Sequence, residues 1–155
     1  MPTMRSDLID AYLFRRPEPG RVELLQLRRT QTPLLGTWQP VMGHLEPGET
    51  AADGMWREVH EETGLERAGA LGAWALEQVH PFFIAETDEF VLSPRFTVET
   101  DKSWEPTLNH EHNDARWIPI EDAPDRFLWP GQHAAIAELR SMLESPDRAD
   151  ALRLP

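Results

Sequence analysis

The sequence predicts one domain of the α/β or α+β class, with two helices packed against several strands. Three observations support this prediction. The chain has 155 residues, enough for one substantial core but too few for two. Short apolar segments flanked by turn residues recur along it, as expected of strands. Two longer segments carry helix-capping residues or helical periodicity. We expect residues 1–145 to form the domain and residues 146–155 to form a polar tail.

Six segments are predicted to be strands. They lie at residues 8–14, 22–27, 72–80, 89–93, 95–100 and 114–120. The first two are joined by a turn rich in proline and glycine, which indicates a hairpin. Residues 28–43 contain Pro33 and Pro40, which exclude a helix, so we expect a loop there with a short extended piece near residues 38–41.

Two segments are predicted to be helices. The first covers residues 50–62, with Thr50 as the N-cap and Asp53 completing the capping pair. Gly64 follows where a left-handed residue ends a helix. The second covers residues 131–145 and has one apolar side, made of Ala135, Ile136, Leu139 and Leu143.

The composition excludes several classes of function. The formal net charge is -12, which argues against binding to a nucleic-acid backbone or to an anionic membrane surface. The chain has no cysteine, so disulfides, thiolate nucleophiles and zinc–sulfur sites are excluded. The uncharged stretch at residues 68–76 is too short to span a bilayer, and we expect a cytoplasmic protein. An anionic substrate would need a cation between itself and this acidic protein.

Three carboxylates gather on one face of the first predicted helix. Glu58 and Glu62 are four residues apart, and Glu61 lies three residues after Glu58. Like charges at this spacing repel, and carboxylates near a helix C-terminus oppose the helix dipole. Gly54 in the helix interior costs about a further 1 kcal/mol relative to alanine. The run is either a solvated acidic helix end or a site for a hard divalent cation such as Mg²⁺.

The wider spacing favours the cation site. The residues Gly43, Glu49, Arg57, Glu58, Val59, Glu61, Glu62, Gly64 and Leu65 stand at fixed intervals within residues 43–65. This pattern resembles the signature of the Nudix hydrolase family, and it covers 23 of the 155 residues. The resemblance implies an α/β/α sandwich with a mixed β-sheet. It also implies hydrolysis of a nucleoside diphosphate linked to another moiety, with Mg²⁺, or Mn²⁺ in its place, as cofactor.

The resemblance assigns roles to the residues of the acidic run. Glu58, Glu61 and Glu62 are similar in position to the family's metal-binding carboxylates, and one of them, Glu58 by preference, would also orient or deprotonate the attacking water. Arg57 is similar to the arginine that pairs with a carboxylate of the signature, here Glu49, and orients the helix.

Three positions around the run carry further implied roles. Met42 is placed to offer its backbone carbonyl to the metal, whereas Gly43 and Gly64 are implied to be conformational.

A further acidic residue is expected from a loop after the signature. Glu111, just before the strand at residues 114–120, is our candidate for a distal metal ligand or base. The alternative is a surface carboxylate without a role. His110 and His112 flank it, but zinc is disfavoured because no further nitrogen or sulfur ligands lie near them in the sequence.

Three residues before the signature are candidates for binding the substrate. Trp38 could stack on a base or anchor the loop, and Arg28 and Arg29 could reach phosphate or end a solvated strand. Other aromatic candidates in loop-like segments are Phe82, Phe83, Trp104 and Trp129.

Short segments at residues 37–43, 109–124 and 128–139 are similar to the branch that cleaves dihydroneopterin triphosphate or dATP. The resemblance therefore implies a Mg²⁺-dependent pyrophosphohydrolase that cuts a (deoxy)nucleoside or pterin triphosphate to monophosphate and pyrophosphate. Alternatives are an ADP-ribose or nucleoside-diphosphate-sugar pyrophosphatase, suggested by Pro81, and a non-catalytic nucleotide-binding domain. The expected partner is a small polyphosphate, and a monomer and a homodimer are both compatible with the sequence.

Overall fold

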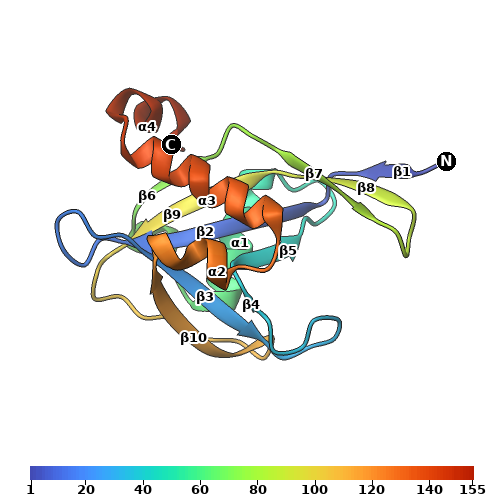
Figure 1. Ribbon diagram of the computed structural model, residues 1–155, viewed down its shortest axis with the longest axis horizontal. Coiled ribbons are helices and arrows are strands. Elements are labelled where there is room, and N and C mark those ends of the chain that lie inside the picture. The colour runs from blue at the N-terminus through green and yellow to red at the C-terminus, as the bar shows by residue number, and fades with distance from the viewer.

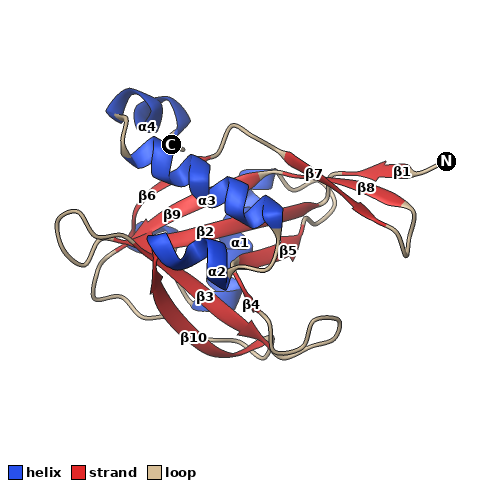
Figure 2. Ribbon diagram, in the orientation of Figure 1, coloured by secondary structure: helices blue, strands red, loops and turns tan.

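The computed structural model describes residues 1–155, except for the side chain of His80. A mixed sheet of seven strands forms its centre (Figures 1 and 2). These strands are β2 (Leu8–Arg15), β3 (Glu23–Arg29), β4 (Trp38–Gln39), β5 (Val41–His44), β6 (Ala70–Ala75), β9 (Arg95–Thr100) and β10 (His112–Pro119). Their order is β10-β3-β2-β9-β6, with β4 beside β3 and β5 beside β2. Strands β2 and β9 run parallel and the other neighbours are antiparallel.

Helices cover both faces of this sheet. They are α1 (Ala51–Thr63), α2 (Ala123–Arg126), α3 (Pro130–Leu143) and α4 (Pro146–Leu152), with short 3₁₀ turns at Arg67–Gly69 and Ile120–Asp122. Figure 1 shows α3 on one face of the sheet and α1 on the other. Side chains alternate along β2, so that Leu13 packs in one cluster with Met55 of α1 and Phe14 packs in a second cluster with Leu139 of α3. The fold is the α/β/α sandwich with a mixed sheet that the resemblance of residues 43–65 implied.

The first predicted helix has the expected ends. Thr50 Oγ1 accepts a hydrogen bond from the Asp53 backbone N–H at 3.2 Å, which caps the N-terminus. Gly64 has φ 73°, a left-handed conformation that favours glycine, and its N–H donates to His60 O. The predicted hairpin of β2 and β3 pairs only near its turn, at Phe14–Leu24 and Arg15–Glu23. Beyond that point β5 takes the place beside β2.

The predicted strand at residues 72–80 is wrong. Strand β6 ends at Ala75, and the backbone N–H groups of Glu77 and Gln78 donate to the Glu138 carboxylate of α3 at 2.6 and 3.3 Å. These bonds turn the chain out of the main sheet. It then enters a second, three-stranded sheet of β1 (Thr3–Arg5), β8 (Glu89–Ser93) and β7 (His80–Ile84), in the order β1-β8-β7. Figure 1 shows this sheet projecting from the body beside the N-terminus.

The segment at residues 146–155, which was expected to be a polar tail, contains helix α4. Ser145 caps α4 through a hydrogen bond from the Arg148 backbone N–H to its Oγ. Ala149 and Leu152 pack against the core cluster that contains α3. The Leu154 N–H then donates to Ala73 O of β6 at 2.8 Å. Two apolar side chains in an otherwise polar segment thus pack a helix against the domain.

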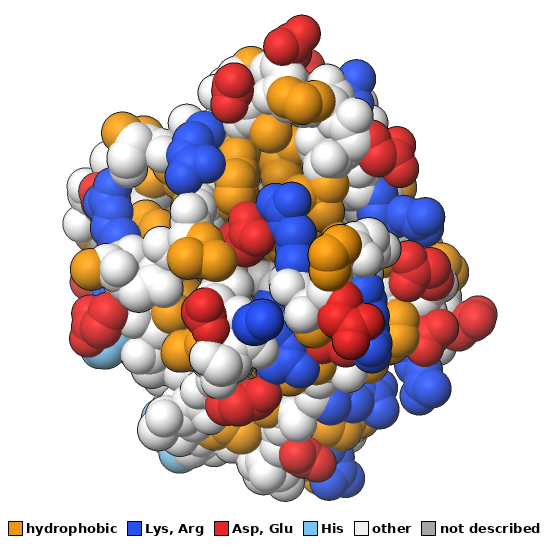
Figure 3. Space-filling view, turned by 90° about the vertical axis from the view of Figure 1, so that its left-hand side faces the viewer, with side chains coloured by type: hydrophobic (Ala, Val, Ile, Leu, Met, Phe, Trp, Pro, Cys, Tyr) orange, Lys and Arg blue, Asp and Glu red, His pale blue; other side chains and the backbone are white. Residues whose placement is uncertain are grey.

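The surface is acidic overall, with both signs of charge present. In the view of Figure 3, acidic and basic side chains are interspersed, and no broad basic face appears there. Among the described residues, no helix combines the length and the apolar character that crossing a membrane requires.

Candidate active site

Strand β5 and helix α1 meet at a very close contact between Gly43 and Glu58. A Cβ atom on Gly43 would lie 2.0 Å from Cδ of Glu58 and 2.2 Å from its Oε1, distances that no side chain could keep. Gly43 is therefore needed so that the Glu58 carboxylate can lie against the β5 backbone. The side chain of Glu58 is 12% exposed as a result.

Arg57 holds the loop before α1 in place. Its Nε and Nη2 donate to the two carboxylate oxygens of Glu49 at 2.9 and 3.0 Å, and Nη2 also donates to His44 O at 2.8 Å. The hydrogen bonds from Arg57 lower the pKa of Glu49. The expected Arg57–Glu49 pair is thus present. Nη1 of Arg57 also donates to Glu58 Oε1 at 2.8 Å, which fixes one oxygen of that carboxylate.

Gly54 has a packing explanation that the sequence did not reveal. A Cβ atom there would lie 2.3 Å from Leu45 Cδ2 and 2.8 Å from Glu49 Oε2. The glycine lets the loop that carries Glu49 lie flat on α1. Its cost to the helix is offset by this packing and does not need a ligand to explain it.

Glu62 is the most isolated charged group of the run. Its side chain is 1% exposed, and neither oxygen has a hydrogen bond of good geometry among the described residues. Burial, followed by the negative charges of Glu58 and Glu111, raises the pKa of Glu62 well above its usual range. A weak interaction with the Met42 backbone N–H opposes this rise only in part.

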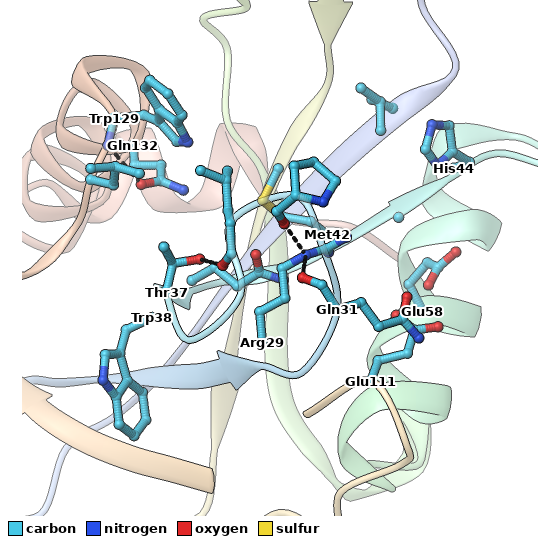
Figure 4. A pocket seen from close by; sticks show the side chains of 16 residues that line it. Arg29, Gln31, Thr37, Trp38, Met42, His44, Glu58, Glu111, Trp129 and Gln132 are labelled. Atoms are coloured by element: carbon cyan, nitrogen blue, oxygen red, sulfur yellow. Dashed lines mark hydrogen bonds between the residues drawn. The ribbon is translucent and has the colours of Figure 1, made fainter. Parts of the chain in front are cut away.

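Glu111 lies near the acidic run, although 46 or more positions separate it in sequence from Gly64 and Leu65. Its loop is tied to the end of β3, because the Thr30 N–H donates to Glu111 O at 2.9 Å. Glu111 and Glu58 line the same cavity of about 460 Å³ (Figure 4). Burial raises the pKa of Glu58, and the charges of Glu61 and Glu111 add to this rise while Arg57 opposes it.

The donor chemistry of the site fits a hard divalent cation. No three carboxylate or imidazole groups within the described part of the chain are already gathered tightly enough to surround an ion. The fit rests instead on the two unpaired, buried oxygens of Glu62 and on the mutual repulsion of Glu58, Glu62 and Glu111. Carboxylate oxygens are the ligands that Mg²⁺ prefers, and a cation would relieve both penalties.

The other predicted site residues divide into two groups. Met42, Arg29 and Trp38 line the cavity with Glu58 and Glu111. Glu61 and Arg28 do not line it. The Glu61 side chain is 52% exposed and makes a long contact of 3.4 Å with Arg57, and Arg28 is exposed at the end of β3.

Two of the predicted substrate-binding side chains are already engaged. Arg116 lies 4.0 Å from the centroid of the Trp38 ring, and Figure 4 shows this ring directed away from the middle of the cavity. The Nε of Arg29 donates to Gln31 O and Pro33 O of its own loop, at 3.1 and 2.9 Å. The contact with Arg116 favours the loop anchor over base stacking for Trp38, and both roles stay predictions.

Several cavity residues were not selected from the sequence. They include Gln31, Gln39, His44, Leu128 and Gln132. Trp129 was considered only among other aromatic candidates, and it also lines the cavity. The one available signal was the segment at residues 128–132, where a proline begins α3 and the adjoining Leu, Trp and Gln stand at the helix entrance.

Comparison with known proteins agrees with this geometry. The model of the NUDIX domain family matches residues 8–139. Octanoyltransferase of Myxococcus xanthus is 31% identical over 132 residues, but the match covers 84% of this chain and only 35% of that protein. The chain thus spans about a third of that relative. RNA pyrophosphohydrolase of Legionella pneumophila (strain Corby) is 24% identical over 119 residues, 68% of each protein.

Solved structures agree on the fold. The crystal structure of a binary complex of an Ap4A hydrolase from C. elegans superposes with a TM-score of 0.75 at 19% identity. The superposition covers 90% of this chain and 98% of that one. The family model covers most of the chain, including the loop and helix that carry Gly43, Glu49, Arg57 and the three glutamates, and the chain therefore belongs to the NUDIX domain family.

Proposed function

We propose that the protein is a Mg²⁺-dependent pyrophosphohydrolase that cuts a (deoxy)nucleoside or pterin triphosphate to a monophosphate and pyrophosphate. The observation that carries the proposal is the group of Glu58, Glu62 and Glu111. Glu58 and Glu111 line one open cavity, and the negative charges of both act on buried Glu62 behind it. Without a cation, the repulsion and burial of these carboxylates destabilise the folded protein. With a cation bound, the same carboxylates would act as its ligands.

The residues that would hold the metal are Glu58, Glu62 and Glu111, together with the backbone carbonyl of Met42. Glu61, whose side chain is exposed to solvent, would be a further ligand on the solvent side of the metal. A bound cation would supply Lewis-acid stabilisation of the phosphates and lower the pKa of a water molecule. Mn²⁺ would serve in place of Mg²⁺, because both prefer oxygen ligands.

The protein's own groups would orient the reactants. The oxygen of water forms a bond to one phosphorus, and the anhydride P–O bond to the neighbouring phosphorus breaks. The proton of that water passes to a carboxylate, for which Glu58 and Glu111 are the candidates because both face the cavity. Arg57 keeps Glu58 in one orientation through its Nη1 hydrogen bond.

Small substrates are favoured over polymeric ones. The net charge of -12 opposes binding of a nucleic-acid backbone, which depends on basic side chains. The name of the Legionella relative supports the reaction class, and its RNA substrate is not carried over. The match to the octanoyltransferase covers 35% of that protein, so acyl transfer is not carried over either.

The test is a panel of substrates with identification of the products. Purified protein is incubated with Mg²⁺, and separately with a chelator, and offered nucleoside triphosphates, a pterin triphosphate, ADP-ribose and a dinucleoside polyphosphate. We expect triphosphates to be cut to monophosphate and pyrophosphate when Mg²⁺ is present, and not when the chelator is present. Release of two monophosphates from ADP-ribose, with triphosphates untouched, would shift the assignment to the sugar-diphosphate class. Nucleotide binding without turnover of any compound would identify a non-catalytic domain.

A further inference from the structure

The cavity has two chemically different ends. Figure 4 shows Glu58 and Glu111 at one end and Trp129 and Gln132, at the start of α3, at the other. Large apolar side chains are exposed at the second end, where Leu128 is 51% exposed and Trp129 is 50% exposed. A substrate with phosphates at one end and a flat ring at the other matches this division.

Gln132 presents a single, fixed hydrogen-bonding group to the cavity. Its side-chain Oε1 accepts a hydrogen bond from the Trp129 backbone N–H at 3.0 Å, which only an oxygen can do. The orientation of the amide is thereby determined. Figure 4 shows the amide nitrogen pointing into the cavity, although the residue is only 4% exposed overall. Gln132 therefore directs its donor, and not its carbonyl oxygen, toward a ligand.

The turn that carries Trp129 and Gln132 is fixed by hydrogen bonds on two sides. Arg95, itself 5% exposed, donates from Nη1 to Gly131 O at 2.7 Å. A His133 ring nitrogen lies 2.7 Å from Phe127 O on the other side of the turn. Pro130 restricts the backbone between them. A donor held this rigidly discriminates between ligands better than a mobile one.

Trp129 is better placed than Trp38 to stack on a ring. Arg116 already occupies one face of the Trp38 ring, 4.0 Å from its centroid. Among the described residues, Trp129 has no stacking or cation–π partner. Base–aromatic stacking contributes affinity with little dependence on the identity of the base. Gln132, which lines the same end of the cavity, is the neighbouring polar side chain that can add dependence on the base.

We propose that Trp129 and Gln132 form the base-binding subsite of this protein and select an oxo-substituted ring, as in guanine or a pterin, over the 6-amino ring of adenine. The guanine edge offers the acceptors N7 and O6, whereas adenine places an N6 amino donor beside N7. The amide donor finds two adjacent acceptors on the first edge, whereas on the second edge only N7 accepts and the neighbouring amino group repels it. The inference rests on the proposed triphosphate substrate and adds the identity of its base.

The experiment compares kcat/KM for dGTP and dATP in the wild type and in Gln132→Glu. The substituted carboxylate keeps one oxygen for the Trp129 N–H and presents the other to the cavity as an acceptor. We expect the wild type to prefer dGTP by roughly tenfold, and the variant to lose or reverse that preference. Gln78→Glu is the matched control, because Gln78 is exposed outside the cavity and the same charge is added there.

A second variant tests the stacking platform. Trp129→Ala is expected to raise KM for both nucleotides alike, and Trp129→Phe is expected to restore most of the affinity. Equal use of dGTP and dATP by the wild type, with no change in Gln132→Glu, would overturn the inference while leaving the proposed function intact.

A binding measurement separates the two hypotheses. Calorimetric titration with non-hydrolysable imido analogues of GTP and ATP needs no turnover. If no triphosphate is cleaved, the proposed function fails. A preference for the guanine analogue that Gln132→Glu abolishes then supports the subsite, and equal binding of the two analogues overturns it.

Discussion

Nδ1 of His112 lies 3.8 Å from Oε2 of Glu62, and both side chains are 1% exposed. Neither of these atoms has a hydrogen bond among the described residues. Burial and nearby Arg29 lower the pKa of His112 to about 4, so the imidazole is neutral at physiological pH and supplies no counter-charge to Glu62. Gln39 Nε2 lies 3.1 Å from the other ring nitrogen, and if this amide donates there, the imidazole proton is on Nδ1 and faces Glu62. The carboxylate still lacks a cation.

The first prediction concerns Glu62→Gln. Because the folded protein favours the neutral form of this carboxyl, the ionised form destabilises the metal-free protein above the usual pKa of glutamate. The amide removes that charge, so we expect a metal-free Tm equal to or above that of the wild type. We also expect Mg²⁺ to raise Tm in the wild type and much less in the variant. Turnover should fall by about two orders of magnitude or more.

Glu61→Gln is the matched control for this experiment, since its side chain is 52% exposed. It should leave the metal-free Tm close to the wild-type value and reduce turnover less than Glu62→Gln does. A Glu62→Gln protein that keeps normal turnover and the full Mg²⁺ shift in Tm would reject Glu62 as a metal ligand.

The second prediction concerns Gly43→Ala. The added Cβ would lie 2.0 Å from Cδ of Glu58, so the carboxylate must move away from β5. A displacement on this scale is expected to reduce kcat by about 100-fold. Gly69→Ala is the control, because the nearest atom to its Cβ would be Leu65 Cδ1 at 3.7 Å, an ordinary contact. Unchanged kcat in Gly43→Ala would mean that the position of Glu58 does not matter for the chemistry.

The third prediction concerns Glu111→Gln. Because the charge of Glu111 raises the pKa values of Glu58 and Glu62, and because it faces the cavity, its loss should change both turnover and the Mg²⁺ concentration at half-maximal rate. We expect kcat to fall at least about tenfold. Glu121→Gln, an exposed carboxylate outside the cavity, should change neither quantity. The same null result in Glu111→Gln would leave Glu111 as a loop carboxylate without a role.

Local signals were sufficient for the helix that carries Glu58 and for several strands, whereas the α/β/α sandwich was implied by the family resemblance. The caps of α1 depend only on Thr50, Asp53 and Gly64, which are close in sequence, and β8 and β9 lie at the predicted residues. The break after β6 could not be predicted, because it depends on Glu138, 61 residues further along the chain. The closeness of Glu111 to the acidic run was expected from the family resemblance and not from any local pattern.

The base end of the cavity also escaped prediction, for a related reason. Trp38 and Trp129 both stand in loop-like segments, and nothing in the sequence shows that Arg116 covers one of them. The role of Gln132 depends on which of its amide atoms is already used, and only the contact with the Trp129 N–H fixes that. Both facts are set by tertiary contacts.

The last prediction decides whether α4 belongs to the domain. Leu152 packs against the core cluster around α3, so Leu152→Ala should lower the free energy of unfolding by about 1–2 kcal/mol. Leu71→Ala, at a position that is 55% exposed on neighbouring β6, is the matched control and should change it little. Denaturant unfolding measures both values. Equal stability of the two variants would mean that α4 adds nothing to the core, and the domain would then end near residue 145, as the sequence had indicated. A loss of stability confined to Leu152→Ala would mean that the domain includes α4.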